Sequence, residues 1–120
     1  MTDLGQLLGE MRPVLHDEPY GFDLLDPDAP LPEDVFALIH EAEGMTLIAP
    51  FPDGEWARIS LAVHSSLSAV GLSAAIARAL ADRNLSANIV AGFHHDHIFV
   101  PWARRDEALA ALEALSEQYR

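Results

Sequence analysis

The chain has 120 residues and a mass of 13.1 kDa, which limits it to one domain or two very small intertwined ones. Half of its residues are hydrophobic and 22% are charged, a composition typical of a soluble globular protein and not of a disordered chain. Seven Lys and Arg against 19 Asp and Glu give a formal net charge of −12, which excludes nucleic-acid and anionic-membrane partners, and the absence of Cys excludes disulfides, thiolate metal sites and thiol catalysis.

The first 32 residues predict a helix, a strand and a loop. Apolar residues recur at helical spacing from Thr2 to Met11, with Thr2 as the N-cap and Pro13 as the stop. Residues 20–24 alternate between apolar residues and small or polar ones, as in a short strand with one apolar face. Residues 26–32 contain three prolines and two aspartates, so we expect a loop there.

A second helix and a second strand are expected next. An apolar stripe at helical spacing predicts a helix over residues 35–42, which Gly44 would end. The stripe consists of Val35, Leu38, Ile39 and Ala42. Residues 45–49 form a compact apolar segment that predicts a strand, closed by Pro50 and the turn residues 52–54.

The C-terminal half predicts alternating strands and helices. In chain order these are a strand at 59–64, a polar turn at 65–68, a helix at 72–80, strands at 87–91 and 98–100 joined by a turn at 94–97, and a helix around the apolar residues 108–115. Asn84 is expected to cap the first of these helices. Asp106 and Glu107 lie in the first turn of the second, where negative charge is favourable.

This order, β-α-β-β-α, lacks the last strand of a ferredoxin-like βαββαβ unit. The strand at residues 20–24 is spare, and placing it in the gap would avoid an exposed sheet edge. We therefore predict an α+β fold, a ferredoxin-like α/β sandwich whose C-terminal unit is completed by a strand from the N-terminal segment.

The passage ISLAVHSSLSAVGLSAAIARALADRNLSANIVAG, residues 59–92, resembles an ACT domain, the small ligand-binding module attached to many enzymes of amino-acid metabolism. Gly71 lies where that family places a glycine at the helix start. The longer pattern AVHSSLSAVGL…NIVAGFHHDHIFVP is similar to stand-alone bacterial ACT-like proteins. The resemblance implies an N-terminal ACT-like α/β segment at 1–55 and an ACT domain at 56–120, intertwined as one compact unit.

The turn that leads into the helix at residues 72–80 is the leading candidate site. Unpaired backbone N–H groups and the helix dipole favour a carboxylate or phosphate at a helix N-terminus, and the resemblance implies that effectors bind there. Alternatively, Ser68 only caps the helix and Gly71 only eases the turn. The ACT family carries an Asp and a Pro before this glycine, and this chain does not, so the family's ligand contacts do not transfer. The candidate ligand-binding residues are His64, Ser65, Ser66, Ser68, Val70, Gly71, Leu72 and Asn88.

A second candidate is the cluster His94, His95, Asp96 and His97, because imidazoles and carboxylates are good ligands for zinc and similar ions. No second motif supplies a remote fourth ligand. The alternative interpretation is a polar hairpin tip in which Asp96 shapes the turn. His64, Ser66 and Asp96 have the residue types of a hydrolase triad, but no nucleophile-elbow or oxyanion-hole motif accompanies them, so we reject a hydrolase.

The sequence therefore predicts a non-catalytic regulatory or sensor module, without a cofactor, that binds a small metabolite, expected to be an amino acid. Two other hypotheses stay open: a metal-binding protein or small metal-dependent enzyme that uses the four hairpin residues, and an interaction domain with no ligand. The open sheet face or a strand edge predicts a homodimer or larger homo-oligomer. No signal-peptide pattern and no apolar run of about 20 residues is present, so we expect a cytoplasmic protein.

Overall fold

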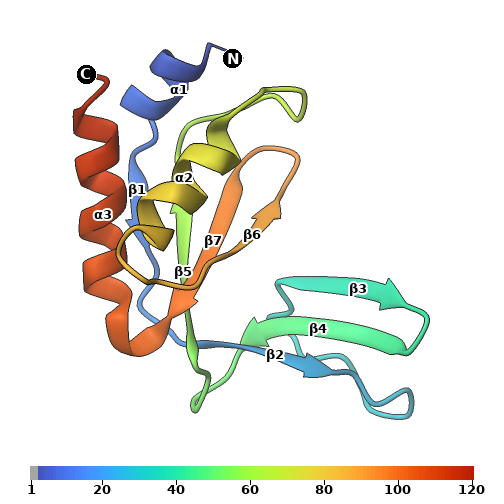
Figure 1. The fold of residues 1–120 in the computed structure, drawn as a ribbon. Helices are drawn as coiled ribbons and strands as arrows, with labels where there is room; N and C mark the ends of the chain where they lie inside the picture. Colours follow the sequence, from blue (N-terminus) through green and yellow to red (C-terminus); the bar gives the residue numbers. More distant parts are fainter. Residues whose placement is uncertain (1–2) are drawn as a thin grey trace.

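The structure is a computed structural model that describes residues 3–120 (Figure 1). Its elements, in chain order, are α1 (Leu4–Gly9), β1 (Pro13–Leu15), β2 (Tyr20–Leu24), β3 (Ala37–Glu41), β4 (Gly44–Pro50), β5 (Trp56–Leu61), α2 (Leu72–Ala81), β6 (Asn88–Ala91), β7 (Asp96–Pro101), the 3₁₀ turn η1 (Trp102–Arg104) and α3 (Arg105–Glu117). No helix within these residues is long and apolar enough to cross a bilayer.

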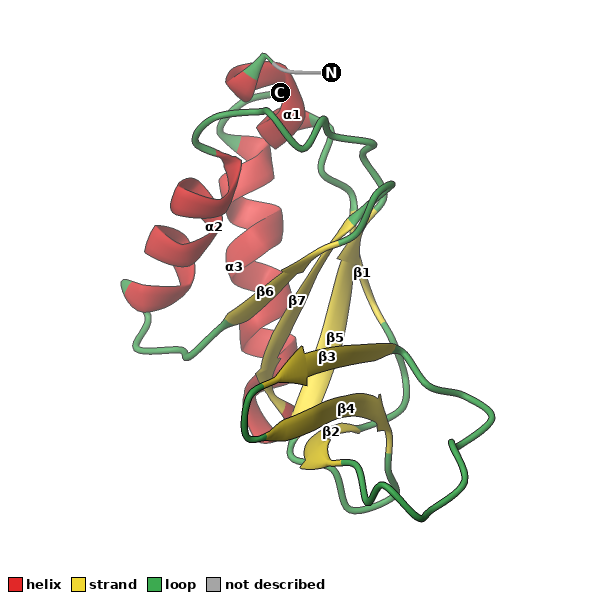
Figure 2. Cartoon of the chain, turned by 90° about the vertical axis from the view of Figure 1, so that its right-hand side faces the viewer, coloured by secondary structure: helices red, strands yellow, loops and turns green. Residues whose placement is uncertain are grey.

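All seven strands belong to one antiparallel sheet with the order β3-β4-β2-β5-β7-β6, and β1 also pairs with β5. The helices gather on one face of the β1-β5-β7-β6 part, and the β2–β4 strands curl away as a separate lobe (Figures 1 and 2). This two-layer α+β arrangement is the predicted ferredoxin-like fold.

A strand from the N-terminal segment completes the C-terminal unit, as predicted, but that strand is mainly β1. It pairs with β5 from Pro13↔Leu61 to Leu15↔Ile59. The strand β2 meets β5 only at Tyr20↔Trp56 and pairs along its length with β4. A three-residue strand is too short to show an alternation of apolar residues, so its sequence carried no signal.

The prediction of a helix over residues 35–42 is wrong, because most of this segment forms the edge strand β3. It pairs with β4 from Ala37↔Ile48 to Glu41↔Gly44, which leaves a two-residue turn at 42–43. An apolar run of this length fits a helix turn or a strand equally well. Pairing with the following strand satisfies the backbone and decides between them.

The helix ends follow local capping chemistry. The expected N-cap Thr2 lies outside the described residues, and the Asp3 carboxylate accepts a hydrogen bond from the Gln6 N–H at 2.8 Å. After α2, Asn84 adopts a left-handed conformation with φ 56°, and the Leu85 N–H donates to the Leu80 carbonyl at 3.0 Å. Asp106 and Glu107 lie in the first turn of α3, as predicted.

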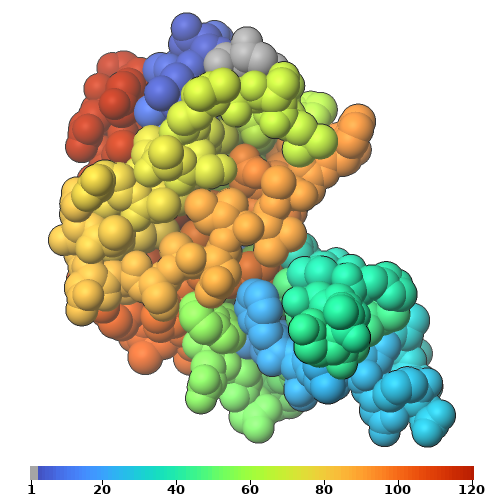
Figure 3. All heavy atoms as spheres, turned by 45° about the vertical axis from the view of Figure 1, so that its right-hand side comes forward, coloured from blue at the N-terminus to red at the C-terminus, as the bar shows by residue number. Residues whose placement is uncertain are grey.

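Two apolar cores lie on opposite faces of the sheet. The larger one packs α1, α2 and α3 against the inward residues of β5 and β7, among them Ile59 and Ile98, both fully buried. The smaller one holds Tyr20, Ile48 and Phe99, and joins the β2–β4 lobe to the outward face of the sheet. The lobe covers only part of that face, and the surface is hollowed between the lobe (blue to cyan) and the β6–β7 hairpin (orange) (Figure 3).

Candidate functional site

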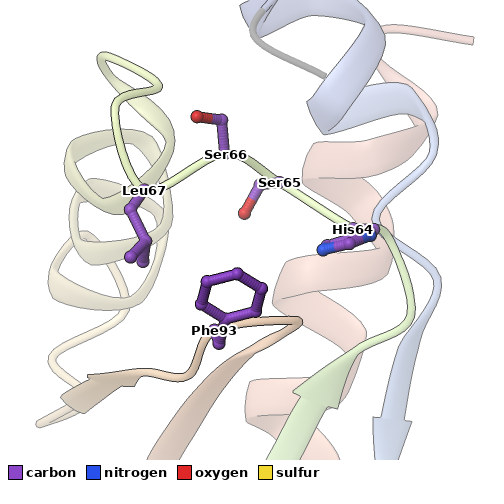
Figure 4. A pocket seen from close by; sticks show the side chains of 5 residues that line it. All are labelled: His64, Ser65, Ser66, Leu67 and Phe93. Atoms are coloured by element: carbon purple, nitrogen blue, oxygen red, sulfur yellow. The ribbon is translucent and has the colours of Figure 1, made fainter.

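An open pocket of about 440 Å³ lies between the segment that follows β5 and the segment that follows β6. Its lining residues are His64, Ser65, Ser66, Leu67 and Phe93 (Figure 4). Three of these residues were predicted from the sequence as ligand-binding. Phe93 comes from the turn between β6 and β7, distant in sequence, and only the tertiary structure places it opposite the segment 64–67.

We call this opening the turn pocket. Hydrogen bonds fix the side chains on its polar side. The buried Ser65 hydroxyl donates to the Asp96 carboxylate at 3.2 Å, which ties the turn to the β6–β7 hairpin. The Ser66 hydroxyl accepts from the Ser68 N–H at 3.2 Å and lies 2.8 Å from the Ser68 hydroxyl. The local Ser66–Ser68 turn fixes the path of the chain before α2.

The apolar side of the turn pocket is open to solvent. Leu67 and Phe93 are 67% and 76% exposed, although each offers a large apolar surface. Two such side chains beside a polar turn can hold a small molecule that has both an apolar and a polar part.

The start of α2 lies apart from the turn pocket. Ser68, Val70, Gly71 and Leu72 do not line it. Gly71 is the N-cap with φ 99°, no side chain caps the helix, and a Cβ on Gly71 would come within 3.0 Å of Leu4 Cδ2. Asn88 lies at the opposite end of β6 from Phe93, so β6 separates this residue from the pocket.

The hairpin histidines do not form one cluster: His94 lies beside His64, His97 lies on the outward face of the sheet, and His95 lies near both His64 and His97. The ring centroids of His64 and His94 lie 5.1 Å apart, and that of His95 lies 6.1 Å from His64 and 6.3 Å from His94. Among residues 3–120, no group of three or more His, Asp or Glu is arranged to hold a metal ion. Asp96 is engaged by Ser65, and His97 takes part in a different cluster.

This second cluster was missed by the sequence analysis and lies on the outward face of the sheet. The Ser60 hydroxyl lies 2.8 Å from His16 Nε2 and 2.9 Å from His97 Nδ1. Arg58 donates from Nε to His97 Nδ1 at 3.4 Å and from Nη1 to the Tyr20 hydroxyl at 2.6 Å. Ser60 lies on the face of β5 opposite the buried Ile59 and Leu61, and its partners depend on the register with β1 and β7, which the sequence does not show.

Burial keeps the two histidines of this cluster neutral. Desolvation is the main cause that lowers the pKa of His97 from 6.5 to about 4, followed by the positive charge of Arg58. Desolvation and Arg58 also lower the pKa of His16. At neutral pH, Arg58 is therefore the charged group of the cluster.

Two ACT-domain family models match the chain, one over residues 53–114 and the other over residues 1–65. The chain belongs to the ACT-domain family. Members of this family are commonly small-ligand regulatory modules, and are generally non-catalytic.

Solved structures show the same architecture. A protein of unknown function from Vibrio cholerae, described as a possible transport protein, is 35% identical, with a TM-score of 0.74 over 90% of this chain and 92% of that chain. A protein from Agobacterium tumefaciens is 12% identical, with a TM-score of 0.70 over 89% of this chain and 90% of that one, and shows the fold alone. No curated protein sequence matches this ACT protein significantly.

Proposed function

We propose that this ACT protein is a non-catalytic sensor that binds a free amino acid in the turn pocket, and that it works in the cytoplasm as a homodimer or larger assembly. The observation that carries the proposal is the juxtaposition of polar and exposed apolar groups around one opening. His64 and Ser66 lie beside Leu67 and Phe93 in a pocket of about 440 Å³. This volume lies within the range of small-molecule sites.

The two kinds of lining group suit the two parts of an amino acid. The imidazole of His64 and the hydroxyl of Ser66 offer hydrogen bonds to its carboxylate or ammonium group. The exposed side chains of Leu67 and Phe93 would lose contact with water on binding, which favours an amino acid with an apolar side chain.

The hydrogen bonding of the serines supports a binding role over a catalytic one. Ser65 donates to a carboxylate, Asp96, and Ser66 pairs with Ser68. A nucleophilic serine requires an adjacent base positioned to take its proton, usually a histidine. Neither serine of the turn pocket has that arrangement.

A melting screen against the common amino acids tests this function, because a ligand that binds only the folded state raises the melting temperature. We expect an apolar amino acid to stabilise the protein and Leu67→Ala to remove most of the shift. Val70→Ala is the matched control, since Val70 is 82% exposed in the same loop but does not line the pocket.

The screen also separates the competing hypotheses. If no amino acid shifts the melting temperature, the proposed function fails and the ligand-free interaction domain takes its place. If a ligand binds equally well to the Leu67→Ala variant, the turn pocket is not its site.

A further inference from the structure

The outward face of the sheet holds a second pocket, of about 310 Å³, which the turn-pocket proposal does not use. The register of β1, β5 and β7 places Val14 and His97 on either side of Ser60. His16 follows β1, and its backbone N–H donates to the backbone carbonyl of Arg58 at 3.0 Å. Three segments distant in sequence thus bring one arginine, one serine and three histidines, His16, His95 and His97, to a single depression.

The hydrogen bonds of this outward pocket determine where its protons lie. The Arg58 Nε–H points at His97 Nδ1, so that nitrogen is an acceptor and the His97 proton is on Nε2. The Ser60 hydroxyl, 2.9 Å away, therefore donates to the same nitrogen. Ser60 then accepts from His16 Nε2, which carries the proton of that ring. The chain of donors and acceptors is complete with both rings neutral.

Arg58 is a positive charge that the protein holds in place without a carboxylate partner. Its guanidinium donates to the Tyr20 hydroxyl and lies 4.6 Å from the centre of the Phe36 ring. The chain has seven arginines and no lysine, and three of these arginines form ion pairs within residues 3–120, with Asp82, Glu107 and Glu117. Arg58 has no such pair among these residues, although acidic residues outnumber basic ones 19 to 7.

The rest of the outward pocket defines the ligand further. Val14 and Ala62 supply apolar surface, and Val14 is 50% exposed. No Asp or Glu lines the pocket, so nothing there would pair with an ammonium group. One fixed guanidinium beside neutral hydrogen-bonding groups matches one negative charge, and its planar set of donors suits a carboxylate.

We propose that the outward pocket of Arg58, Ser60, His16 and His97 is a binding site for a small aliphatic monocarboxylate that lacks an ammonium group. Arg58 pairs with the carboxylate, and Val14 and Ala62 contact the aliphatic part. This site is separate from the turn pocket and takes a different class of ligand.

Nuclear magnetic resonance titration of the intact protein tests the site with defined probes: isovalerate, its neutral amide isovaleramide, valine and inorganic phosphate. We expect millimolar isovalerate to shift the resonances of Val14, Ser60 and His97 and to leave those of Phe93 unchanged. Isovaleramide, valine and phosphate should each bind at least about tenfold more weakly, because the amide lacks the charge, valine adds an ammonium group and phosphate lacks the aliphatic part. Isovalerate shifts confined to the Phe93 region, or equal affinity for the amide, valine or phosphate, would overturn the assignment.

Arginine variants provide the second arm. Arg58→Gln should lower isovalerate affinity by about tenfold or more, and Arg58→Lys should retain part of it because the charge remains. Arg78→Gln is the control, since Arg78 is exposed on α2. If Arg58→Gln does not fold, the Arg58→Lys variant and the wild-type titration decide. Unchanged affinity in either Arg58 variant overturns the proposal, and Leu67→Ala, which tests the turn pocket, should leave isovalerate binding intact.

Discussion

At Gly71 the backbone conformation requires a glycine, which the sequence motif alone only suggested. The sequence placed a glycine at a helix start, and the structure gives the reason: φ is 99°, which L side chains rarely adopt, and Leu4 fills the space where a Cβ would stand. The role that the structure shows for Gly71 is to let the turn close against α1.

Replacing Gly71 with Ala should destabilise the protein by about 1–2 kcal/mol, because the left-handed backbone is strained for alanine. Gly5→Ala is a control of opposite sign. A Cβ at Gly5 meets its nearest neighbour at 3.6 Å, and alanine stabilises a helix interior by about 0.5–1 kcal/mol. Denaturant unfolding of both variants measures the difference, and a Gly71→Ala variant as stable as Gly5→Ala would contradict the assigned role.

His97 predicts a pH dependence of stability. Its pKa falls from 6.5 to about 4 on folding, through burial and the neighbouring Arg58, His95 and His16. Between these two values the unfolded chain binds more protons than the folded one. The contribution of His97 to stability is therefore complete above about pH 6.5 and is lost as the pH falls toward 4.

Melting temperatures measured from pH 7.5 down to pH 4.5 cover most of this window and report the effect. The free energy of unfolding should change by at most about 1.4 kcal/mol per unit of pKa shift, and by less here because His97 is partly exposed to solvent. We expect the His97→Gln variant to lose less stability on acidification than the wild type. His40→Gln is the control because His40 is exposed on β3, and it should follow the wild type. Equal slopes in all three proteins would exclude this role for His97.

Among the elements, α1 depends most on tertiary contacts. It has six residues, too few to form an isolated helix, yet Leu7 and Leu8 are fully buried in the larger core. Its stability therefore comes from packing against α2 and α3.

Leu8→Ala should therefore cost about 2–5 kcal/mol, the usual range for a leucine truncated in a packed core. Leu4→Ala, at a position 37% exposed on the same helix, should cost much less. Chemical denaturation followed by circular dichroism compares the two. Similar losses in both variants would show that α1 is not docked as the structure has it.

The elements that the sequence predicted correctly are those with a sustained period, such as α2, α3 and the alternating strand β5. The errors occurred where pairing with another segment decides the conformation: β1 is too short for a period, and β3 is a strand because β4 follows it. The candidate site divides in the same way. The family resemblance identified His64, Ser65 and Ser66 on one continuous segment, whereas Phe93 and the Arg58 cluster are assembled by strand register, which no local pattern encodes.

At the scale of the whole molecule, the sheet formed by residues 3–120 has three edge strands: β3, β6 and the short β1, which pairs only with β5. Of these, β3 presents the largest apolar surface, with Leu38 37% and Ile39 45% exposed. Exposed edge strands readily pair with another chain unless charges or coverage prevent it. An antiparallel pair of β3 strands would join two copies around a two-fold axis and bury these side chains.

We therefore predict a homodimer through β3, detectable by light scattering across the micromolar range. Ile39→Lys should shift the equilibrium to the monomer, because the ammonium group would be desolvated in the paired edge. Leu31→Lys is the control: Leu31 is 55% exposed in the loop before β3, outside the strand edge, and its substitution should leave the dimer intact. A wild-type monomer at all concentrations would contradict self-association. A dimer that survives Ile39→Lys unchanged would place the interface away from β3, with β1 and β6 as the other edge strands within residues 3–120 that could provide it.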